Sequence, residues 1–156
     1  MTVAEHPPGR IPVFVDASAW IAAAASPTGG SSLVLEACGG KRFAAICSQR
    51  VLLEAQHNIR DKMTTHVMVR FYQLLSATSP SQVPPVTAET EAPYAEIVGP
   101  KDAHVVAAAV HGGAAFLVTL DRKHLANDRV RAAGLPLEAL TPGEFIRLIL
   151  AEHPAP

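Results

Sequence analysis

Acidic residues stand at two positions where the sequence predicts that a buried strand ends. Asp16 follows the apolar run of residues 13–15, and Asp121 follows the run of residues 115–120. Short apolar runs that contain β-branched residues are typical of buried strands. Because parallel strands end at the same edge of a sheet, we expect both carboxylates at that edge, where open α/β sheets bind their ligands.

Two carboxylates that meet at one edge repel each other, and each raises the pKa of the other unless positive charge neutralises them. A divalent cation supplies that charge, and hard oxygen ligands suit Mg²⁺ or Mn²⁺, which also bind phosphate oxygens. Taken singly, Asp16 and Asp121 are better explained as ordinary turn or capping residues. Taken together, they predict a metal site.

Two further acids are candidates for the same site, and the pattern leaves both open. Asp102 lies in the first turn of a predicted helix at residues 101–111, on the face that carries Val105. It is equally well explained as an acid that stabilises the helix dipole. Glu54 lies at the border of the apolar row of a predicted helix at residues 48–63, where a solvated position is favoured.

The rest of the chain predicts helices that alternate with strands, which implies right-handed crossovers and a mainly parallel sheet. Strands are predicted at residues 11–16, 43–47, 115–120 and 137–140, with a short edge strand near residues 83–86. Helices are predicted at residues 18–25, 32–38, 48–63, 65–77, 101–111, 125–133 and 142–150. Ser18 is expected to cap the first helix through its hydroxyl. The prolines of residues 80–93 predict a loop-rich segment.

The length of 156 residues fits one domain. We expect a flexible lead-in at residues 1–10, the domain at residues 11–150 and a frayed tail at residues 151–156. Thirteen Lys and Arg face 14 Asp and Glu, which gives a net charge of −1. The chain as a whole therefore does not attract nucleic acid, and a polyanionic substrate requires a local basic patch or bound cations.

Cysteine usage and hydropathy predict a cytoplasmic protein. Cys38 and Cys47 show no zinc or redox spacing and are expected to be reduced thiols. The apolar stretches are interrupted well before the ~18 residues that a membrane-spanning helix needs, so no membrane segment is expected. Five histidines show no spacing typical of metal ligands: His57, His66, His104, His111 and His124. Two of them, His104 and His111, lie seven residues apart on one predicted helix and are expected to be packed or hydrogen-bonded.

Four short motifs resemble, in their order and spacing, those of the PIN domain family. They are Val-Phe-Val-Asp16-Ala-Ser18, Leu-Leu-Glu54, Lys-Asp102-Ala and Val-Thr119-Leu-Asp121. The similarity covers residues 12–148 and is greatest to the prokaryotic PIN domains that serve as toxin components of toxin–antitoxin pairs. It implies a three-layer α/β/α fold with a central, mainly parallel sheet, and a metal-dependent ribonuclease activity.

The resemblance also implies roles for individual residues. Four acids would form the catalytic cluster and hold one or two Mg²⁺ or Mn²⁺ ions: Asp16, Glu54, Asp102 and Asp121. Ser18 matches an Asp-x-Ser element and Thr119 a Thr-x-Asp element of the family. Thr119 and Asp121 are expected on one strand face, where the Thr119 hydroxyl would orient a carboxylate. Relatives often carry further acids just before Asp102, whereas Pro100 and Lys101 stand there in this chain, which puts a second metal in question.

Three basic residues flank the acids and are candidates for contacts with the RNA backbone, although solvated helix-end charge is the slightly better explanation of each one taken alone: Lys101, Arg122 and Lys123. The expected reaction is hydrolysis of an RNA phosphodiester. The resemblance further implies an antitoxin protein as a partner, and a homodimer. The alternative is a PIN-like module without nuclease activity, which would hold RNA or a protein through the same edge.

Overall fold

The structure is a computed structural model that describes residues 9–152. Most of the predicted lead-in, residues 1–8, and most of the predicted tail, residues 153–156, lie outside the described residues. No helix between residues 9 and 152 combines the length and the apolar character needed to cross a membrane.

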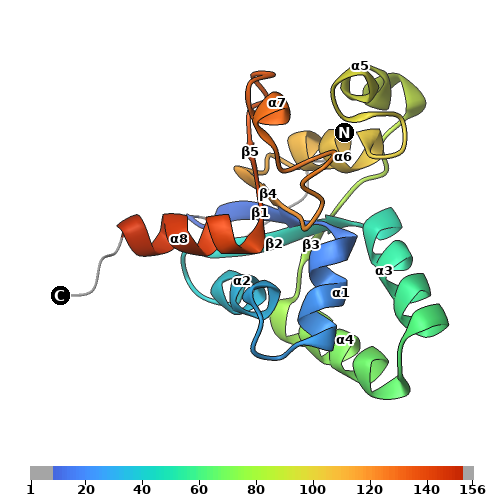
Figure 1. The fold of residues 1–156 in the computed structure, drawn as a ribbon, viewed down its shortest axis with the longest axis vertical. Coiled ribbons are helices and arrows are strands. Elements are labelled where there is room, and N and C mark those ends of the chain that lie inside the picture. The colour runs from blue at the N-terminus through green and yellow to red at the C-terminus, as the bar shows by residue number, and fades with distance from the viewer. Residues whose placement is uncertain (1–8, 153–156) are drawn as a thin grey trace.

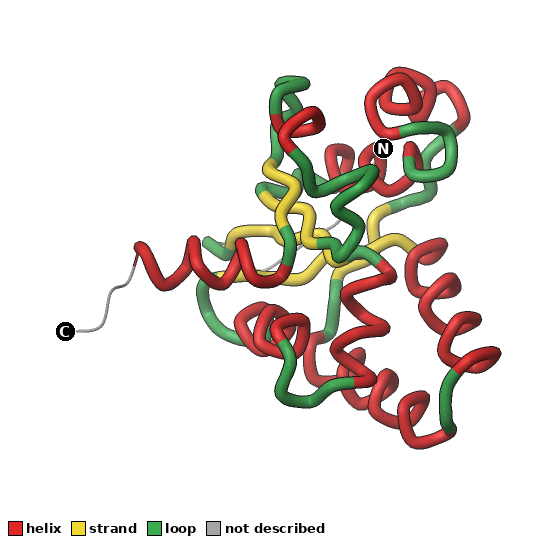
Figure 2. Tube along the Cα trace, in the orientation of Figure 1, coloured by secondary structure: helices red, strands yellow, loops and turns green. Residues whose placement is uncertain are grey.

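A sheet of five parallel strands forms the centre of the molecule (Figures 1 and 2). The strands lie side by side in the order β3-β2-β1-β4-β5. Their bounds are Ile11–Val15 (β1), Phe43–Ser48 (β2), Ser81–Val83 (β3), Phe116–Val118 (β4) and Glu138–Leu140 (β5). Every pairing between neighbours is parallel, so all five strands end at the same edge.

Helices cover both faces of this sheet (Figure 1). One face carries α1 (Ala17–Ala25), α2 (Gly30–Cys38), α3 (Gln49–Lys62), α4 (Thr65–Thr78) and α8 (Pro142–Glu152). The other face carries α5 (Ala88–Val98), α6 (Ala103–His111) and the short α7 (Asp128–Arg131). This arrangement confirms the predicted three-layer α/β/α fold with its parallel sheet.

The last three residues of β1 are buried because this strand lies at the centre of the sheet. The side chains of Val13, Phe14 and Val15 are fully buried, as expected for a strand covered on both faces. Below the sheet, Trp20 packs edge-to-face on Phe71 with ring centroids 6.3 Å apart. Above it, the small side chains of α6 allow the helix to approach the strands closely. These two layers fix the carboxyl ends of β1 and β4 in space.

Residues 80–93 differ from the predicted loop-rich segment, because α5 begins inside them. Thr87 caps this helix by accepting a hydrogen bond from the backbone N–H of Thr90 at 3.2 Å. Pro93 lies in the middle of α5, where it removes one backbone N–H from the helix, so α5 forms despite a residue that disfavours it. The predicted edge strand exists as β3, but it ends at Val83 because the prolines that follow cannot donate to a strand neighbour.

Candidate metal centre at the carboxyl edge of the sheet

Asp16 and Thr119 are neighbours because the strands that carry them are paired. Val15 ends β1 and lies beside Val118, the last residue of β4. The Asp16 N–H donates to the Val118 carbonyl at 3.0 Å, which holds the two chain ends together. The Thr119 hydroxyl then donates to Oδ2 of Asp16 at 2.7 Å. Both side chains are buried, so this contact fixes the Asp16 carboxylate firmly.

Ser18 supports the same carboxylate and does not cap the helix. The predicted cap is wrong because Asp16 leaves β1 with an extended backbone and itself occupies the N-cap position of α1. Ser18 therefore lies inside the first turn, where its hydroxyl donates to Oδ2 of Asp16 at 3.2 Å. Its oxygen accepts from the Leu120 N–H at 3.0 Å, which ties α1 to the segment after β4.

Asp121 lies in a turn beyond β4. The predicted shared strand face with Thr119 is wrong, because β4 ends at Val118 and the chain bends. The Thr119 hydroxyl oxygen instead accepts the Asp121 N–H at 3.1 Å. Asn127 stabilises the rest of the turn by donating to the carbonyls of Arg122 and Lys123 at 3.0 and 3.1 Å. The hydroxyl of Thr119 thus links Asp16 and Asp121 by direct bonds.

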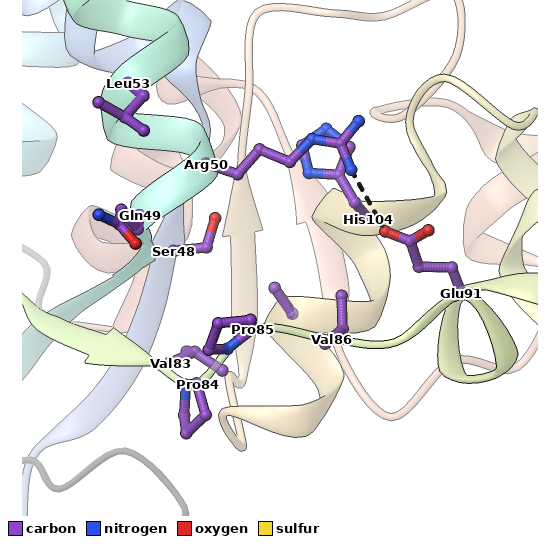
Figure 3. Close-up of a pocket in the computed structure, with 11 residues that line it drawn as sticks. Ser48, Gln49, Arg50, Leu53, Val83, Pro84, Pro85, Val86, Glu91 and His104 are labelled. Carbon is purple, nitrogen blue, oxygen red and sulfur yellow. Dashed lines mark hydrogen bonds and ion pairs between the residues drawn. The ribbon is translucent and has the colours of Figure 1, made fainter.

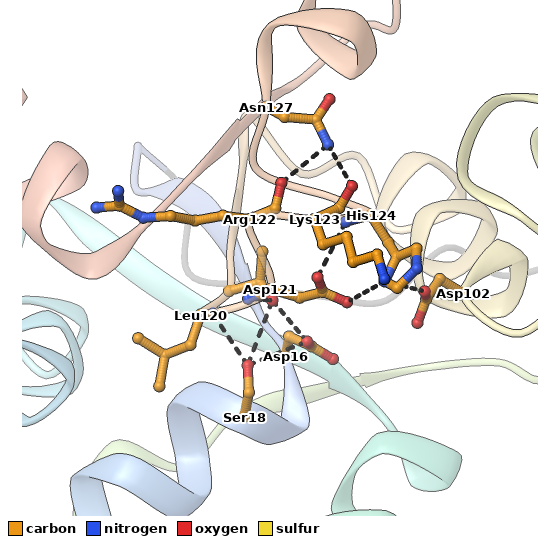
Figure 4. Close-up of polar contacts among 10 residues, drawn as sticks. Asp16, Ser18, Asp102, Leu120, Asp121, Arg122, Lys123, His124 and Asn127 are labelled. Carbon is orange, nitrogen blue, oxygen red and sulfur yellow. Dashed lines mark hydrogen bonds and ion pairs between the residues drawn. The ribbon is translucent and has the colours of Figure 1, made fainter.

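Asp102 and His124 complete a group of three metal-ligating side chains (Figure 4). Asp102 is the N-cap residue of α6 and its side chain bonds no backbone N–H there. Nδ1 of His124 lies 3.2 Å from Oδ2 of Asp121 and 3.9 Å from Oδ2 of Asp102. One ligand atom from each of these three residues lies within 4.8 Å of the other two. This group is compact enough to hold a cation.

Sequence reasoning missed His124, since it sought histidines in pairs. The signal that could have found it is the i,i+3 spacing from Asp121. The His124 N–H donates to Oδ1 of Asp121 at 3.0 Å, so the backbone turn that holds Asp121 also brings the imidazole to it. A histidine that follows a strand-end aspartate by three residues is therefore a candidate ligand even without a histidine partner.

Burial and neighbouring carboxylates raise the pKa values of three acids at this edge. Burial raises the pKa of Asp16, and the hydrogen bond from Thr119 offsets only part of the effect. Burial and then the charge of Asp121 raise the pKa of Asp102. Burial and then the charge of Asp16 raise the pKa of Glu54. Neighbouring carboxylates of this kind fit a divalent cation such as Mg²⁺ or Mn²⁺.

Glu54 lies on the rim of this group. It projects from α3 and is solvent-exposed, as its place on the predicted helix indicated. The charges of Asp16 and Asp102 nevertheless act on it, which places it beside the cluster. The four acids of the sequence motifs are therefore brought to one edge, with Glu54 as the most exposed of them.

Comparison with known proteins decides the family. Residues 12–123 match the family model described as PIN domain. The chain belongs to the PIN domain family. The match includes every acid of the edge and both hydroxyl residues that support Asp16.

Solved structures share this PIN fold at low sequence identity. A chain of VapBC2 from Rickettsia felis, crystallised with a DNA fragment from the promoter, is 17% identical, with a TM-score of 0.59 over 84% of this chain and 98% of that one. PAE2754 from Pyrobaculum aerophilum is 17% identical, with a TM-score of 0.58 over 92% and 99%. VapC20 from Mycobacterium tuberculosis, a toxin that cleaves the sarcin–ricin loop, is 18% identical, with a TM-score of 0.51 over 80% and 98%. Among curated proteins, none matches this sequence.

The basic residues near the PIN domain's acids differ in their position. Lys101 is exposed, and its charge acts on both Glu54 and Asp102, so it lies beside the cluster. Arg122 points away from the carboxylates in Figure 4 and lines a different surface hollow together with Arg147. Of these two residues, Lys101 is thus the one that lies next to the acids, and a role of Lys123 at the RNA backbone stays a prediction.

Proposed function

We propose that this PIN domain is an endoribonuclease that depends on a divalent cation. The observation that supports it best is the set of acids at the carboxyl edge, in which burial and neighbouring carboxylates raise the pKa values of Asp16, Glu54 and Asp102. Within the described part of the chain, several carboxylates lie together here without an arginine partner. Because they repel one another, they are suited to bind a cation from solution. The ion pairs found between residues 9 and 152 include no arginine bound to these acids.

Asp16, Asp102 and Asp121 would hold the cation, with Glu54 completing the set and His124 adding a nitrogen ligand. When bound, Mg²⁺ or Mn²⁺ supplies a Lewis acid that neutralises phosphate charge and favours ionisation of water. Thr119 and Ser18 orient the Asp16 carboxylate through their hydroxyl groups. Glu54, being exposed, can accept a proton from the attacking water. Lys101 can bind the RNA backbone beside the scissile bond.

We further propose that the protein is the toxin of a toxin–antitoxin pair that acts in the cytoplasm. Support comes from the similarity of its fold to VapC20, a toxin that cleaves the sarcin–ricin loop, and to VapBC2. The partners are then an RNA substrate and an antitoxin protein, and we expect a homodimer. Light scattering of the purified chain tests the dimer, and co-expression with the neighbouring gene product tests the antitoxin.

The ribonuclease proposal is tested with purified protein and single-stranded RNA. We expect cleavage with Mn²⁺ or Mg²⁺, no cleavage in EDTA, and recovery when the metal is added back. An Asp16→Asn preparation, purified in parallel, controls for contaminating nucleases. Equal cleavage by this variant, or cleavage that persists in EDTA, would show that the assignment is wrong.

One observation favours a second candidate, a PIN module that binds RNA or protein without cleaving it. His124 lies against Asp102 and Asp121, and a protonated imidazole would offset part of their charge without any metal. Such a module would show no metal-dependent rise in unfolding temperature and no cleavage, while still retaining RNA or a partner protein on a column.

A further inference from the structure

A cavity of about 260 Å³ opens at the carboxyl ends of β2 and β3 (Figure 3). We call it the side pocket and define it by six lining residues: Ser48, Arg50, Leu53, Pro85, Glu91 and His104. Two helices that carry acids of the metal centre also line this pocket. The helix α3 contributes Glu54 to the acids, and α6 begins at Asp102. The side pocket and the acids are therefore neighbours along both helices.

His104 is a buried polar side chain without a partner. It is only 7% exposed, and no hydrogen bond to its ring is found within the described part of the chain, residues 9–152. The two nitrogens of an imidazole ring can serve a ligand as hydrogen-bond donor and acceptor. The ring lines the side pocket and its nitrogens are not sealed from solvent, so a ligand in the pocket can bond to them.

The charge of the side pocket is already balanced. Arg50 reaches from α3 across the cavity toward His104 and Glu91 (Figure 3). Its Nη1 lies 3.4 Å from Oε1 of Glu91, so the guanidinium has an acidic partner. The Ser48 oxygen accepts the Val51 N–H at 3.1 Å, which leaves its hydroxyl proton free to donate. This lining favours a neutral ligand with polar edges over a phosphate or a carboxylate.

The size and walls of the side pocket indicate a flat ligand. Leu53 and Pro85 supply apolar surface, and neither donates a hydrogen bond from its side chain. Pockets for drug-sized ligands are roughly 300–1,000 Å³, whereas this cavity of about 260 Å³ suits one ring system. A planar heterocycle would stack on the apolar walls and direct its polar edge to His104 and Ser48.

We propose that the side pocket binds one nucleobase of the RNA, next to the scissile phosphodiester, and sets a base preference for cleavage. This inference rests on the proposed ribonuclease function, since the acids place the phosphate and the pocket receives a neighbouring base. An apolar side chain of a protein partner is the competing occupant. It fits the walls but leaves the His104 ring unpaired, so the base is favoured.

Binding is tested first without metal, so that cleavage plays no part. Full-length ¹⁵N-labelled protein in EDTA is titrated with adenosine, cytidine, guanosine and uridine, and the histidine ring signals are followed by NMR. We expect at least one nucleoside to shift the His104 signals in a saturable way. His111, near the end of α6 and outside the side pocket, should not respond.

Two variants alter the pocket by different routes. His104→Leu removes the polar ring atoms, and Leu53→Trp fills the mouth from a position that is 45% exposed. Each should weaken nucleoside binding by about tenfold or more, which corresponds to one lost hydrogen-bonding or packing contact. His111→Leu and Leu33→Trp are the matched controls, because Leu33 is 49% exposed on α2 and lies outside the pocket. Thermal unfolding checks that every variant folds.

Cleavage of a randomised RNA pool with Mn²⁺ is tested second, by sequencing the product ends. The parent should show one enriched base at a fixed position beside the cleavage site. Both pocket variants should reduce that enrichment, and the two control variants should retain it. Shifts at His104 in EDTA support the pocket even if no RNA is cleaved, in which case the ribonuclease proposal alone fails. No shift with any nucleoside, or shifts only with N-acetylleucinamide as an apolar probe, overturns the inference.

Discussion

Two carboxylate sites at the carboxyl edge of the sheet are neutralised in different ways. After β5, the carboxylate of Glu144 accepts two hydrogen bonds from Nη2 of Arg131, at 2.8 and 3.0 Å, and one from the Thr141 N–H at 2.9 Å. After β1, the Asp16 side chain accepts bonds from the hydroxyl groups of Thr119 and Ser18. The first site contains its own cation, and the second does not.

The pKa values record this difference. Burial acts to raise the pKa of Glu144, but the hydrogen bonds from Thr141 and the charge of Arg131 outweigh it and lower the pKa. Burial raises the pKa of Asp16, and its hydrogen bonds do not compensate. A structural carboxylate is thus satisfied within the chain, whereas the acids of the metal centre still need positive charge. The comparison predicts that changes at the two sites have opposite consequences.

The largest effect is expected for Asp16→Asn. Removing the charge should lower the rate of RNA cleavage by about 10³-fold, as for the loss of a central electrostatic group. In EDTA, however, the variant should be more stable than the parent by on the order of 1 kcal/mol, or ~3 °C in Tm, because a buried charge without a partner is costly. The rise in Tm that Mn²⁺ gives the parent should disappear.

Calorimetry with and without Mn²⁺ measures the change in stability and the loss of the Mn²⁺-induced rise in Tm, and an RNA cleavage assay measures the rate. Asp61→Asn is the control, because Asp61 is an exposed acid on α3 whose ion-pair partner is Arg60. If the Asp16→Asn variant in EDTA unfolds at a lower temperature than the parent, the carboxylate is structural and the contrast with Glu144 fails.

The next effect separates two buried threonines at adjacent strand ends. Thr119→Val removes the hydroxyl that bonds both Asp16 and Asp121, and should weaken Mn²⁺ binding by about 10–100-fold. Thr141→Val removes a hydroxyl that accepts the Glu144 N–H at 3.2 Å, and should lower stability alone. Titration calorimetry with Mn²⁺ measures the affinities. Equal loss of Mn²⁺ affinity in both variants would mean that the effect is general loosening of the fold.

A smaller effect is expected for His124→Asn. Imidazole nitrogen suits Mn²⁺ better than Mg²⁺, which prefers oxygen ligands. Mn²⁺ affinity should therefore fall about tenfold, the low end of what loss of a site group costs, while Mg²⁺ affinity changes less. His66→Asn, an exposed site on α4, is the control. Loss of the ¹⁴N coupling in the Mn²⁺ electron spin resonance spectrum would report the ligand directly; an unchanged coupling would place His124 outside the metal's ligands.

The fold was largely predictable because its signals are local. Two examples are the apolar run before Asp16, which is typical of a buried strand, and the alanine- and valine-rich segment before Gly112, which is typical of a buried helix. The position of Asp16 directly after a buried strand was predictable for the same reason, whereas the metal-binding role of the four acids stays a prediction. The helix α5 was not, because capping by Thr87 outweighed the prolines around it, and propensity alone does not weigh these two effects.

Side-chain contacts within the site were the least predictable part. From the sequence, Ser18 is a suitable N-cap residue for the first helix. The extended backbone at Asp16 makes Asp16 the N-cap residue instead, so Ser18 lies in the first turn and its hydroxyl points toward the Asp16 carboxylate. His124 reaches Asp121 through a backbone turn that depends on Asn127. Both depend on the path of the chain after a strand ends, where no periodic pattern constrains it.

The smallest effect is expected at the satisfied carboxylate. Glu144→Gln removes the charge that pairs with Arg131, and should cost about 1 kcal/mol at pH 7 for a partly exposed pair of this kind. It should leave Mn²⁺ affinity and RNA cleavage unchanged. Because the pKa of Glu144 is lowered by folding, its stabilising contribution is present above the ordinary value of 4.5 and is lost as the pH falls through the folded value.

The difference in unfolding free energy between the parent and Glu144→Gln should therefore shrink below pH 4.5. The comparison with the parent is needed because protonation of the acids of the candidate metal centre stabilises the metal-free fold over part of the same pH range. Both proteins keep those acids, so this effect cancels in the difference in unfolding free energy. Glu138→Gln, at an exposed position of β5, is the control and should show no pH-dependent gap. Two results would contradict this prediction: a difference in unfolding free energy that stays constant as the pH falls, or a change in Mn²⁺ affinity in Glu144→Gln. Either would show that Glu144 belongs electrostatically to the candidate metal centre. The division of the strand ends into a self-neutralised site and a site that requires a cation would then not hold.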